Sequence, residues 1–571
     1  MVTDPGQKVS EKKGKPTIAK SASATNAALY GSPDVNRVDA QSLVDNDRPA
    51  RSHFAERRTG HQRAPYRVSL DRWFVRFDAI LAGERAWIGA IMFVLVLQLA
   101  LTTRHRPWLD EWQALQLAVQ SPRLSVLLFN LRYEGHPPLW YLILRGLAVL
   151  FSDPARALPA AALLVAIPVQ LTILLAAPFG RAERVMLALS EFVLFEYLTL
   201  SRSLTLGIGL MVAIAALWKR PRVVWLLIAL LPQCDFLFGL VSVVFVGLRW
   251  REWRIVWPFA ALWVVSGLGA AWLIRPAPDI VTALVPNALV PDFSAWIARM
   301  GTLGLPLQWR GFVPQWNMPP PMPLRGLALF GFFAVAYVEL RKRPVYGWAF
   351  VLFVVAVLGF DLTVYQLSIR HLTIIAMFLI FLVWRMADDG IAQSIWWRAW
   401  LLVICICGLL TATIALSLPF DTDTEAAALI NRLGLRDRTW VSFPNSAGQG
   451  VAAIDGIMFE RLSEHCSEDF IRWNASDEHS IPDAGALNER LQQKVAQDGR
   501  FYLISSNLMA DRPPLIHRIG HVDRRSYDGQ TYDLYVVGQD HPLARPHNQP
   551  CAEPHLPLRQ HSQPGISHEP S

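Results

Sequence analysis

The apolar residues of this chain are gathered in long blocks instead of recurring at the spacing of an amphipathic helix or strand. Most blocks are about 16 to 24 residues long, close to the length that a helix needs to cross a bilayer. Short Arg-rich segments separate them. The pattern therefore predicts a mainly α-helical protein that spans a membrane many times.

Eleven blocks are predicted to be transmembrane helices, which together form a helical bundle over residues 85–418. Tryptophan, with 22 residues in the chain, often stands at the block ends, as in the aromatic belt of a membrane interface. Residues 222–250 could instead form one long span, which would reverse the side of every later segment. The predicted spans are 86–103, 157–178, 183–200, 203–219, 222–233, 235–250, 253–274, 325–341, 346–365, 370–387 and 397–418.

Positive charge predicts on which side each connection lies, because cytoplasmic loops are rich in Lys and Arg. Residues 1–80 are polar, have no apolar run and end in an Arg-dense stretch. We therefore expect a disordered cytoplasmic tail and no cleavable signal peptide. The loops that eleven spans place on that side are rich in Arg, whereas the opposite connections hold few, except the long loops 104–155 and 275–324. The count puts the segment after residue 418 outside the cytoplasm.

Residues 420–540 differ because polar residues and short strand-like segments replace the apolar blocks. They predict a small α/β domain on the outer side, which in a bacterium is the periplasm. Gly448-Gln449-Gly450 is too short for a phosphate-binding loop and is interpreted as a turn. Residues 541–571 are rich in Pro, His and Gln and are predicted to be disordered. The expected elements are helices from Thr422 or Thr424 to Leu433 and near 485–497, and strands Thr439–Phe443, Phe501–Ser505 and Tyr532–Val537.

Composition limits the kinds of protein that fit. Of 571 residues, 53% are hydrophobic and only 18% are charged, with a net charge of +8. We exclude a nucleic-acid partner because the Arg residues lie between spans instead of lining one polar surface. Cys405 and Cys407 fall inside a span, while Cys466 and Cys551 could pair in an oxidising compartment.

Polar side chains that could carry chemistry fall on the outer side of this topology. The first outer loop contains Asp110-Glu111 and, further on, Glu134-Gly135-His136-Pro137-Pro138. Arg202 follows the third span and Arg370-His371 begins the tenth, both on the same side. Charged groups at a membrane boundary are costly unless they are solvated or paired, so such a set predicts a functional site.

Each of these segments also has a structural explanation when taken alone. Asp110-Glu111 could cap a short helix over 111–120, where acids suit the positive end of the helix dipole. His136-Pro137-Pro138 could be a stiff turn before an interfacial helix, and Arg202 and Arg370 could be interfacial anchors. The acid pair followed in the same loop by Glu-x-His-Pro-Pro is harder to explain in this way.

Together these segments resemble the GT-C superfamily of membrane glycosyltransferases. Leu109-Asp110-Glu111 and Glu134-Gly135-His136-Pro137-Pro138-Leu139 are similar to the first outer loop of the branch that contains protein O-mannosyltransferases and the lipid A aminoarabinose transferase. Ser201-Arg202-Ser203-Leu204 is similar to an Ala-Arg-x-Tyr segment of the family, with Leu204 in place of Tyr. Arg370-His371-Leu372 is similar to its Arg-Tyr-Leu segment, with His371 in place of Tyr. The resemblance covers about 85–390.

The resemblance implies that a sugar, a hexose or a pentose, moves from a polyprenyl phosphate to an acceptor at the outer face of a bacterial inner membrane. Asp110 would be the general base, and Glu111 would support it or act in its place. The family often has a second acid at the end of its third span, where this chain instead offers Glu196, one turn further in. The acceptor could be a glycan, a lipid or a protein.

Further side chains are expected to bind substrate, and two of them are arginines, which suit a phosphate. No cofactor is certain, but Asp110, Glu134 and His136 could together hold a divalent metal ion. The expected substrate-binding residues are Glu134, His136, Arg202, Arg370 and His371.

Two other classes of protein share parts of this pattern. A transporter or flippase for a lipid-linked sugar should show repeated halves and charges at mid-depth, and the sequence has no evident internal repeat. A non-catalytic membrane scaffold would not need the two first-loop motifs. Loop 275–324, with Trp296, Trp309 and Trp316, is interpreted either as a helix on the membrane surface or as a lid over the sugar donor.

Overall fold

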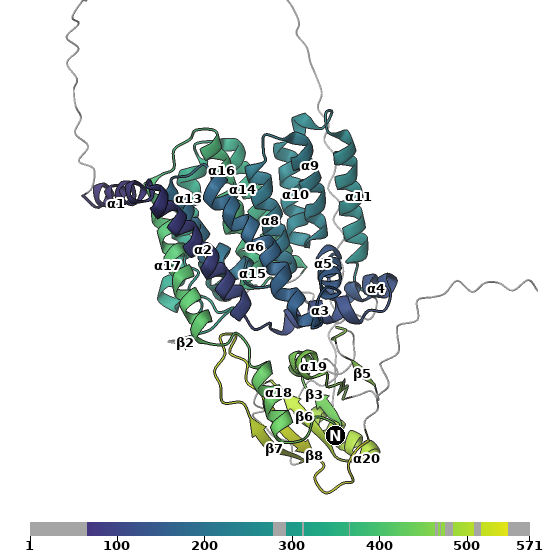
Figure 1. Cartoon of the computed structure of the whole chain (residues 1–571). Helices are drawn as coiled ribbons and strands as arrows, with labels where there is room; N and C mark the ends of the chain where they lie inside the picture. Colours follow the sequence, from purple (N-terminus) through teal and green to yellow (C-terminus); the bar gives the residue numbers. More distant parts are fainter. Residues whose placement is uncertain are drawn as a thin grey trace, which may run out of the picture. The chain divides into compact units, whose positions relative to one another are not determined.

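The computed structural model describes residues 65–277, 293–310, 313–364, 366–462, 466–468, 470–473, 484–506 and 515–545. Within these residues the chain forms a helical bundle up to Ser417, followed by a mixed sheet flanked by helices (Figure 1). Residues 1–64 and 546–571 lie outside the described residues, so the disorder predicted for them stays a prediction.

All eleven apolar blocks are helical in the structure. Within the described residues, six helices are long and apolar enough to cross a membrane by length and composition, which confirms a mainly helical protein with several candidate spans. The other blocks form shorter helices, so the number of eleven spans stays a prediction. The helices are α2 (Glu84–Arg104), α6 (Ala157–Ala176), α7 (Arg181–Ala188) with the π-helix Phe192–Tyr197, α8 (Ser203–Ala216), α9 (Pro221–Leu230), α10 (Phe236–Leu248), α11 (Trp257–Leu273), α13 (Met322–Leu340), α14 (Pro344–Thr363), α16 (Ile374–Asp388) and α17 (Ile395–Ser417).

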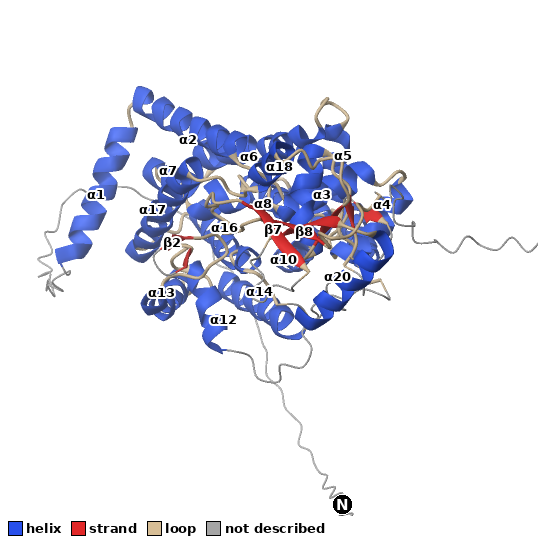
Figure 2. Cartoon of the chain, turned by 90° about the horizontal axis from the view of Figure 1, so that it is seen from below, coloured by secondary structure: helices blue, strands red, loops and turns tan. Residues whose placement is uncertain are grey.

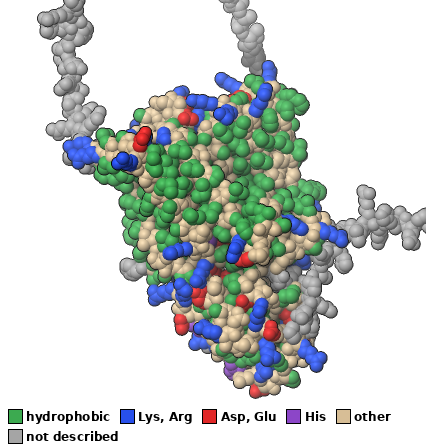
Figure 3. Space-filling view, viewed as in Figure 1, with side chains coloured by type: hydrophobic (Ala, Val, Ile, Leu, Met, Phe, Trp, Pro, Cys, Tyr) green, Lys and Arg blue, Asp and Glu red, His purple; other side chains and the backbone are tan. Residues whose placement is uncertain are grey.

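The segment Ile369–Asp388 lies at the centre of the bundle, and the other long helices surround it. Of the 18 most apolar consecutive residues in this segment, 94% are buried, whereas only 22% are buried in the corresponding part of α2. Many apolar side chains of the outer helices are exposed, and hydrophobic side chains cover the helical part while Lys and Arg lie mainly toward its ends (Figure 3). An exposed apolar surface of this extent suits lipid tails.

Residues 222–250 form two helices, as the eleven-span prediction requires. Asp235 caps the second helix, because its carboxylate accepts a hydrogen bond from the Leu237 amide at 3.0 Å. After this turn the chain returns, and the Arg249 guanidinium donates to the Trp218 carbonyl at 2.8 Å. The two ends of the segment therefore lie together, while Asp235 lies beside the first outer loop.

Basic side chains from separate helices gather at one end of the bundle. The Arg398 guanidinium contacts Glu183 at 2.9 Å and Asp71 at 3.1 Å. Those of Arg249 and Arg385 lie over the Trp218 ring, 4.3 and 5.0 Å from its centre. This end is opposite to that of the candidate site, because Arg202 precedes α8 and Trp218 follows it.

Residues 65–80 belong to a helix, α1 (Pro65–Leu81), and not to a disordered tail as predicted from the sequence. The helix lies at the edge of the bundle, nearly perpendicular to the bundle helices (Figure 1), and the Asp78 carboxylate accepts from the Ala182 amide at 2.8 Å. Trp73, Val75 and Ile80 are exposed on it. A short amphipathic helix with many charges produces no apolar run, which explains why hydropathy alone missed it.

The two long outer loops contain more structure than their polar sequences indicate. The first forms α3 (Leu109–Gln120), which covers the expected helix 111–120, and two further helices, α4 (Leu124–Glu134) and α5 (Leu139–Ala148). Gly135, with a φ of 69°, ends α4 in the left-handed conformation that favours glycine. The second loop contains α12 (Phe293–Met300), β1 (Trp309–Arg310) and β2 (Val313–Pro314), and its residues 278–292 lie outside the described part.

The sheet has the strand order β5-β4-β3-β6-β8-β7, with parallel pairing among β4, β3 and β6. Helices pack on both faces, with α18 and α19 against one core and α20 against the other, and β7 and β8 are seen from the side of the α/β domain in Figure 2. The elements are α18 (Asp423–Arg432), β3 (Trp440–Ser442), α19 (Gln449–Asp455), β4 (Phe459–Glu460), β5 (Ser467–Glu468), α20 (Ala484–Asp498), β6 (Phe501–Ser505), β7 (Ile516–His521) and β8 (Asp533–Val537).

Two predictions in this region need correction. Gly448-Gln449-Gly450 is not an isolated turn, because Gln449 and Gly450 begin α19. Gly450 permits close packing of α19 on α18, since a Cβ there would lie 1.6 Å from the Asp423 carboxylate. The start of the predicted disordered tail is also ordered, because the Ala544 amide donates to the Arg500 carbonyl at 2.8 Å.

Candidate active site

A cavity of about 550 Å³ lies where the first outer loop meets the ends of the helices, and five of the seven predicted site residues line it. They come from four separate parts of the chain. Glu111 and Glu134 do not line it. The lining residues are Trp108, Asp110, His136, Arg202, Ser203, Leu204, Trp316, Asn317, Ser368, Arg370 and His371.

Asp110 is the accessible acid of this cavity. Its side chain is 34% exposed, and one oxygen lies 3.4 Å from the Arg202 guanidinium. Arg202 also donates a hydrogen bond to the backbone carbonyl of Asp110. Because the arginine touches both the backbone and the carboxylate, it fixes the acid while leaving room for a substrate hydroxyl.

His136 links the same arginine to a buried acid. Its Nδ1 lies 3.0 Å from the Asp235 carboxylate and its Nε2 lies 3.3 Å from a guanidinium nitrogen of Arg202. A guanidinium can only donate, so Nε2 accepts and Nδ1 carries the proton. Asp235, which forms the turn between α9 and α10, therefore sets the tautomer of a histidine 99 residues away.

Glu111 is fully buried behind Asp110, and its oxygens are used within the protein. One oxygen lies 2.6 Å from His105 Nε2 and 3.2 Å from the Trp108 amide, and the other accepts from the Ser201 amide at 2.5 Å. These contacts join the start of α3 to the segment before α8. Of the two roles expected for Glu111, the arrangement favours support of Asp110.

Glu134 lies at the end of α4, next to Gly135 and His136. The Gln113 amide donates to its carboxylate at 2.5 Å. Burial raises the pKa of Glu134 above its usual range, while the Gln113 hydrogen bond and the charge of Arg202 act in the opposite direction.

Arg370 is 4% exposed and lines the cavity. Its Nε lies 3.7 Å from the Glu196 carboxylate, and the Tyr197 hydroxyl donates to its backbone carbonyl at 2.8 Å. Nε and Nη2 have no hydrogen-bond partner among the described residues. Buried guanidinium groups are normally hydrogen-bonded, so Arg370, a residue of the cavity lining, has donor capacity left that suits an anion.

Aromatic rings flank the cavity. Trp108 of the first loop and Trp316 of the second meet edge to face, with ring centres 4.7 Å apart, and Phe420 packs against Trp316 at 5.3 Å. Trp316 Nε1 donates to the Glu196 carboxylate at 3.1 Å. The described part of loop 275–324 therefore contributes to the cavity wall and is held by the acid that also faces Arg370.

The side chains proposed as metal ligands do not fit a divalent cation. Both ring nitrogens of His136 are engaged, Glu134 is bonded to Gln113, and the Arg202 cation lies beside Asp110. Within the described residues, no group of three or more His, Cys, Asp or Glu side chains is arranged to hold a metal ion.

Several residues of the site do not follow from the sequence. Ser368 and Asn317 line the cavity and Asp235 contacts His136, but none of the three has a local sequence signal. Asn317 has a φ of 58°, and its backbone N–H donates a hydrogen bond to Gln308 Oε1 at 2.5 Å. A left-handed Asn is common among non-glycine residues with that conformation, but nothing in the sequence places it at the cavity.

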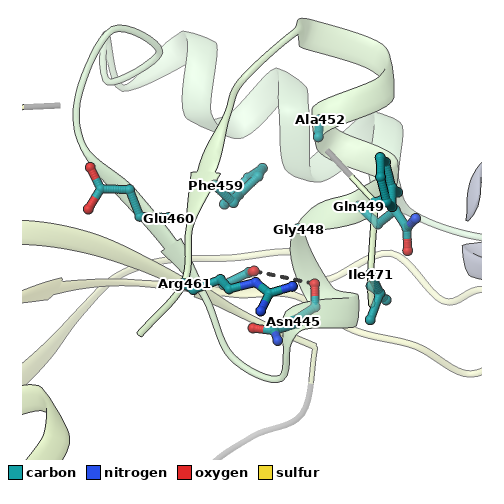
Figure 4. Close-up of a pocket in the computed structure, with 10 residues that line it drawn as sticks. Asn445, Gly448, Gln449, Ala452, Phe459, Glu460, Arg461 and Ile471 are labelled. Carbon is teal, nitrogen blue, oxygen red and sulfur yellow. Dashed lines mark hydrogen bonds between the residues drawn. The ribbon is translucent and has the colours of Figure 1, made fainter. Parts of the chain in front are cut away.

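A second cavity, of about 370 Å³, lies in the α/β domain (Figure 4). It opens between the end of β3, the start of α19 and β4, and none of the predicted site residues lines it. Its carboxylate, Glu460, is paired with Lys494 at 3.0 Å. Gln449 and Ile471, which also line it, contact the first outer loop.

Comparison with known proteins gives one structural match. No family model and no curated protein match the chain. The crystal structure of ArnT from Cupriavidus metallidurans bound to undecaprenyl phosphate is similar to it, with 12% identity and a TM-score of 0.43, over 80% of this chain and 98% of that one. At this similarity no residue role or substrate is transferred from ArnT.

Proposed function

We propose that this protein is a membrane glycosyltransferase that moves a sugar from a polyprenyl phosphate to an acceptor at the outer face of a bacterial inner membrane. The observation that carries the proposal is the convergence of an accessible acid, Asp110, and two buried arginines, Arg202 and Arg370, around one cavity. An acid facing cations across a cavity is the arrangement that sugar transfer from a phosphate requires.

In the proposed reaction the acceptor hydroxyl loses its proton to Asp110 while its oxygen bonds to the anomeric carbon of the sugar. The bond from that carbon to the phosphate oxygen breaks, and the polyprenyl phosphate leaves with the electron pair. Arg370, whose Nε and Nη2 make no hydrogen bond within the described residues, would donate hydrogen bonds to the developing negative charge. Arg202, held by His136 and Asp110, orients the base.

The location follows from the two ends of the molecule. The basic end suits the cytoplasm, so the candidate site and the α/β domain would face outward. Cys466 is disulfide-bonded, which is typical of an oxidising compartment such as the periplasm; Cys551 lies outside the described residues. A sugar donor with a prenyl chain would reach the cavity from the bilayer.

A transfer assay tests the proposal. The purified protein is incubated with radiolabelled polyprenyl-phosphate sugars of several kinds and a membrane extract that supplies the acceptor. We expect label to move into an acceptor with the wild type, and Asp110→Asn to lower the rate by about 100-fold or more, the usual effect of losing a general base. Asp153→Asn, which changes a 57% exposed acid in the same loop, is the matched control and should retain the rate.

The outcomes separate the alternatives. Specific binding of a donor without any transfer would contradict the proposal and favour a transporter or a scaffold. Full activity of Asp110→Asn would remove the general base from the mechanism. The label that is transferred would also identify the sugar.

A further inference from the structure

A single buried glutamine joins the α/β domain to the candidate site. Gln113, on α3 and only 3% exposed, donates from Nε2 to the Glu134 carboxylate at 2.5 Å and to the Ile471 carbonyl at 2.8 Å. Its Oε1 accepts from the Ile471 amide at 2.9 Å and from the Gln449 side chain. Its three partners therefore come from the first loop and from two segments of the α/β domain.

The hydrogen-bonding capacity of Gln113 is completely used by these contacts. A glutamine amide has two N–H donors and one oxygen with two lone pairs, and each of the four has a partner. The α/β domain engages both lone pairs and one N–H. It thereby fixes which way the amide faces, so that the remaining N–H points at Glu134.

Glu134 connects the fixed Gln113 amide to the residues that line the cavity. It stands at the end of α4, and Gly135 and the cavity-lining His136 follow it directly. His136 in turn contacts Arg202, which holds Asp110. A displaced Glu134 would therefore change the position of the groups that orient the acid.

We propose that Gln113 is a positioning residue, through which the α/β domain holds Glu134 and the first-loop motif in their active arrangement. The proposal rests on the proposed function where transfer is the readout. It gives the outer domain a role in the reaction that does not require it to touch the sugar. Because Gln449 and Ile471 also line the cavity of the α/β domain (Figure 4), the contact lies at the wall of that cavity.

The principal test compares Gln113→Leu with Gln116→Leu. Leucine has nearly the volume of glutamine but no hydrogen bonds. Gln116 lies one turn further along α3, is also buried, and donates to the Gln449 carbonyl at 3.4 Å. It contacts the α/β domain without a recorded bond to Glu134. We expect Gln113→Leu to lower kcat at least tenfold with less than a twofold change in donor KM, and Gln116→Leu to stay within twofold of wild type in both.

The pH dependence of transfer provides a readout that loss of packing would not move. Burial raises the pKa of Glu134, as does the charge of Asp110, whereas the Gln113 hydrogen bond and the charge of Arg202 lower it. Removing the hydrogen bond raises the pKa further. If the ionised carboxylate is the active form, the acid limb of the pH–rate profile should shift to higher pH in Gln113→Leu and not in Gln116→Leu.

Hydrogen exchange separates this inference from the proposed function. We expect backbone amides of 131–136 to exchange at least tenfold faster in Gln113→Leu, and faster in Gln449→Leu, which removes a partner on the α/β domain. This measurement needs no enzymatic activity, so it holds even if wild type transfers no sugar. Wild-type exchange in both variants would overturn the proposal, as would an unchanged kcat and acid limb in Gln113→Leu. If that variant fails to fold, Gln449→Leu carries the same test.

Discussion

Glu196 shows how a residue that never reaches the cavity can set the properties of one that does. Its two oxygens face Arg370 at 3.7 Å and Trp316 Nε1 at 3.1 Å. It thus holds both the arginine proposed for the phosphate and a ring of the cavity wall. Its charge also compensates that of a buried guanidinium, which would be costly without a partner.

Replacing Glu196 by Gln keeps the shape and removes this charge. We expect the donor KM to rise about tenfold, because losing a buried ion-pair partner disturbs Arg370 by more than about 1.4 kcal/mol. The kcat should change less, since Asp110 is untouched. Transfer kinetics over a range of donor concentrations measure both. Glu191→Gln is the control, because that acid bonds Gln308 at 3.2 Å and has no recorded ion pair; an equal effect there would contradict the role of Glu196.

The candidate site could be predicted from the sequence where its residues form one local motif, and not where they meet only in three dimensions. Asp110 and His136 stand out because they belong to short segments of unusual polarity in one loop. Gln113 and Asp235 look like ordinary polar residues, and their importance comes from partners 358 and 99 residues away. No sequence spacing encodes such contacts.

The elements themselves follow the same division. Apolar blocks and the apolar strand Phe501–Ser505 have a strong local signal, and the structure forms them where predicted. β7, with the sequence Ile-His-Arg-Ile-Gly-His, has mostly exposed or half-buried positions. It forms because it pairs with β8 at the sheet edge, and tertiary pairing of this kind overrides weak strand propensity.

Buried acids at the start of α18 are expected to make the stability of the fold depend on pH. Burial, together with the charge of Asp528, raises the pKa of Asp423 from 3.8 to about 7, against the hydrogen bond of Tyr532. Asp421, whose pKa burial also raises, lies two residues before it. As pH rises from about 4 to 7, Asp423 loses its proton in the unfolded chain before it does so in the folded chain. The stability that these acids contribute is therefore greatest at low pH and falls through this window.

Thermal unfolding at pH 5, 6, 7 and 8 tests this expectation. We expect the transition of the wild type to fall by about 4 °C or more across the series, and Asp423→Asn, which imitates the protonated acid, to flatten the dependence and to be more stable than wild type at pH 8. Asp437→Asn, at an exposed position of the same domain, should follow the wild type. A transition that rises with pH in the wild type would refute the assignment.

At the scale of the whole molecule, the proposed chemistry depends on which side of the membrane the cavity faces. The basic residues lie at one end of the bundle and the acids of the site at the other. This arrangement requires residues 222–250 to cross the membrane twice, as the contact of Arg249 with Trp218 indicates. If that segment crossed once, every later loop would change sides. Arg370 and Asp110 would then lie on opposite sides, and no cavity could contain both.

Single cysteines at exposed positions decide between these topologies. The native Cys234, Cys405 and Cys407 are buried and Cys466 is disulfide-bonded, so their background reactivity should be low, with wild type as the control. A membrane-impermeant maleimide applied to intact cells should label Arg123→Cys and Arg438→Cys, and label Arg343→Cys only after permeabilisation; all three positions are exposed. A single crossing at 222–250 predicts the reverse for Arg343→Cys and Arg438→Cys while leaving Arg123→Cys unchanged. That result would separate the two arginines proposed for the site and sink the transferase mechanism together with the topology.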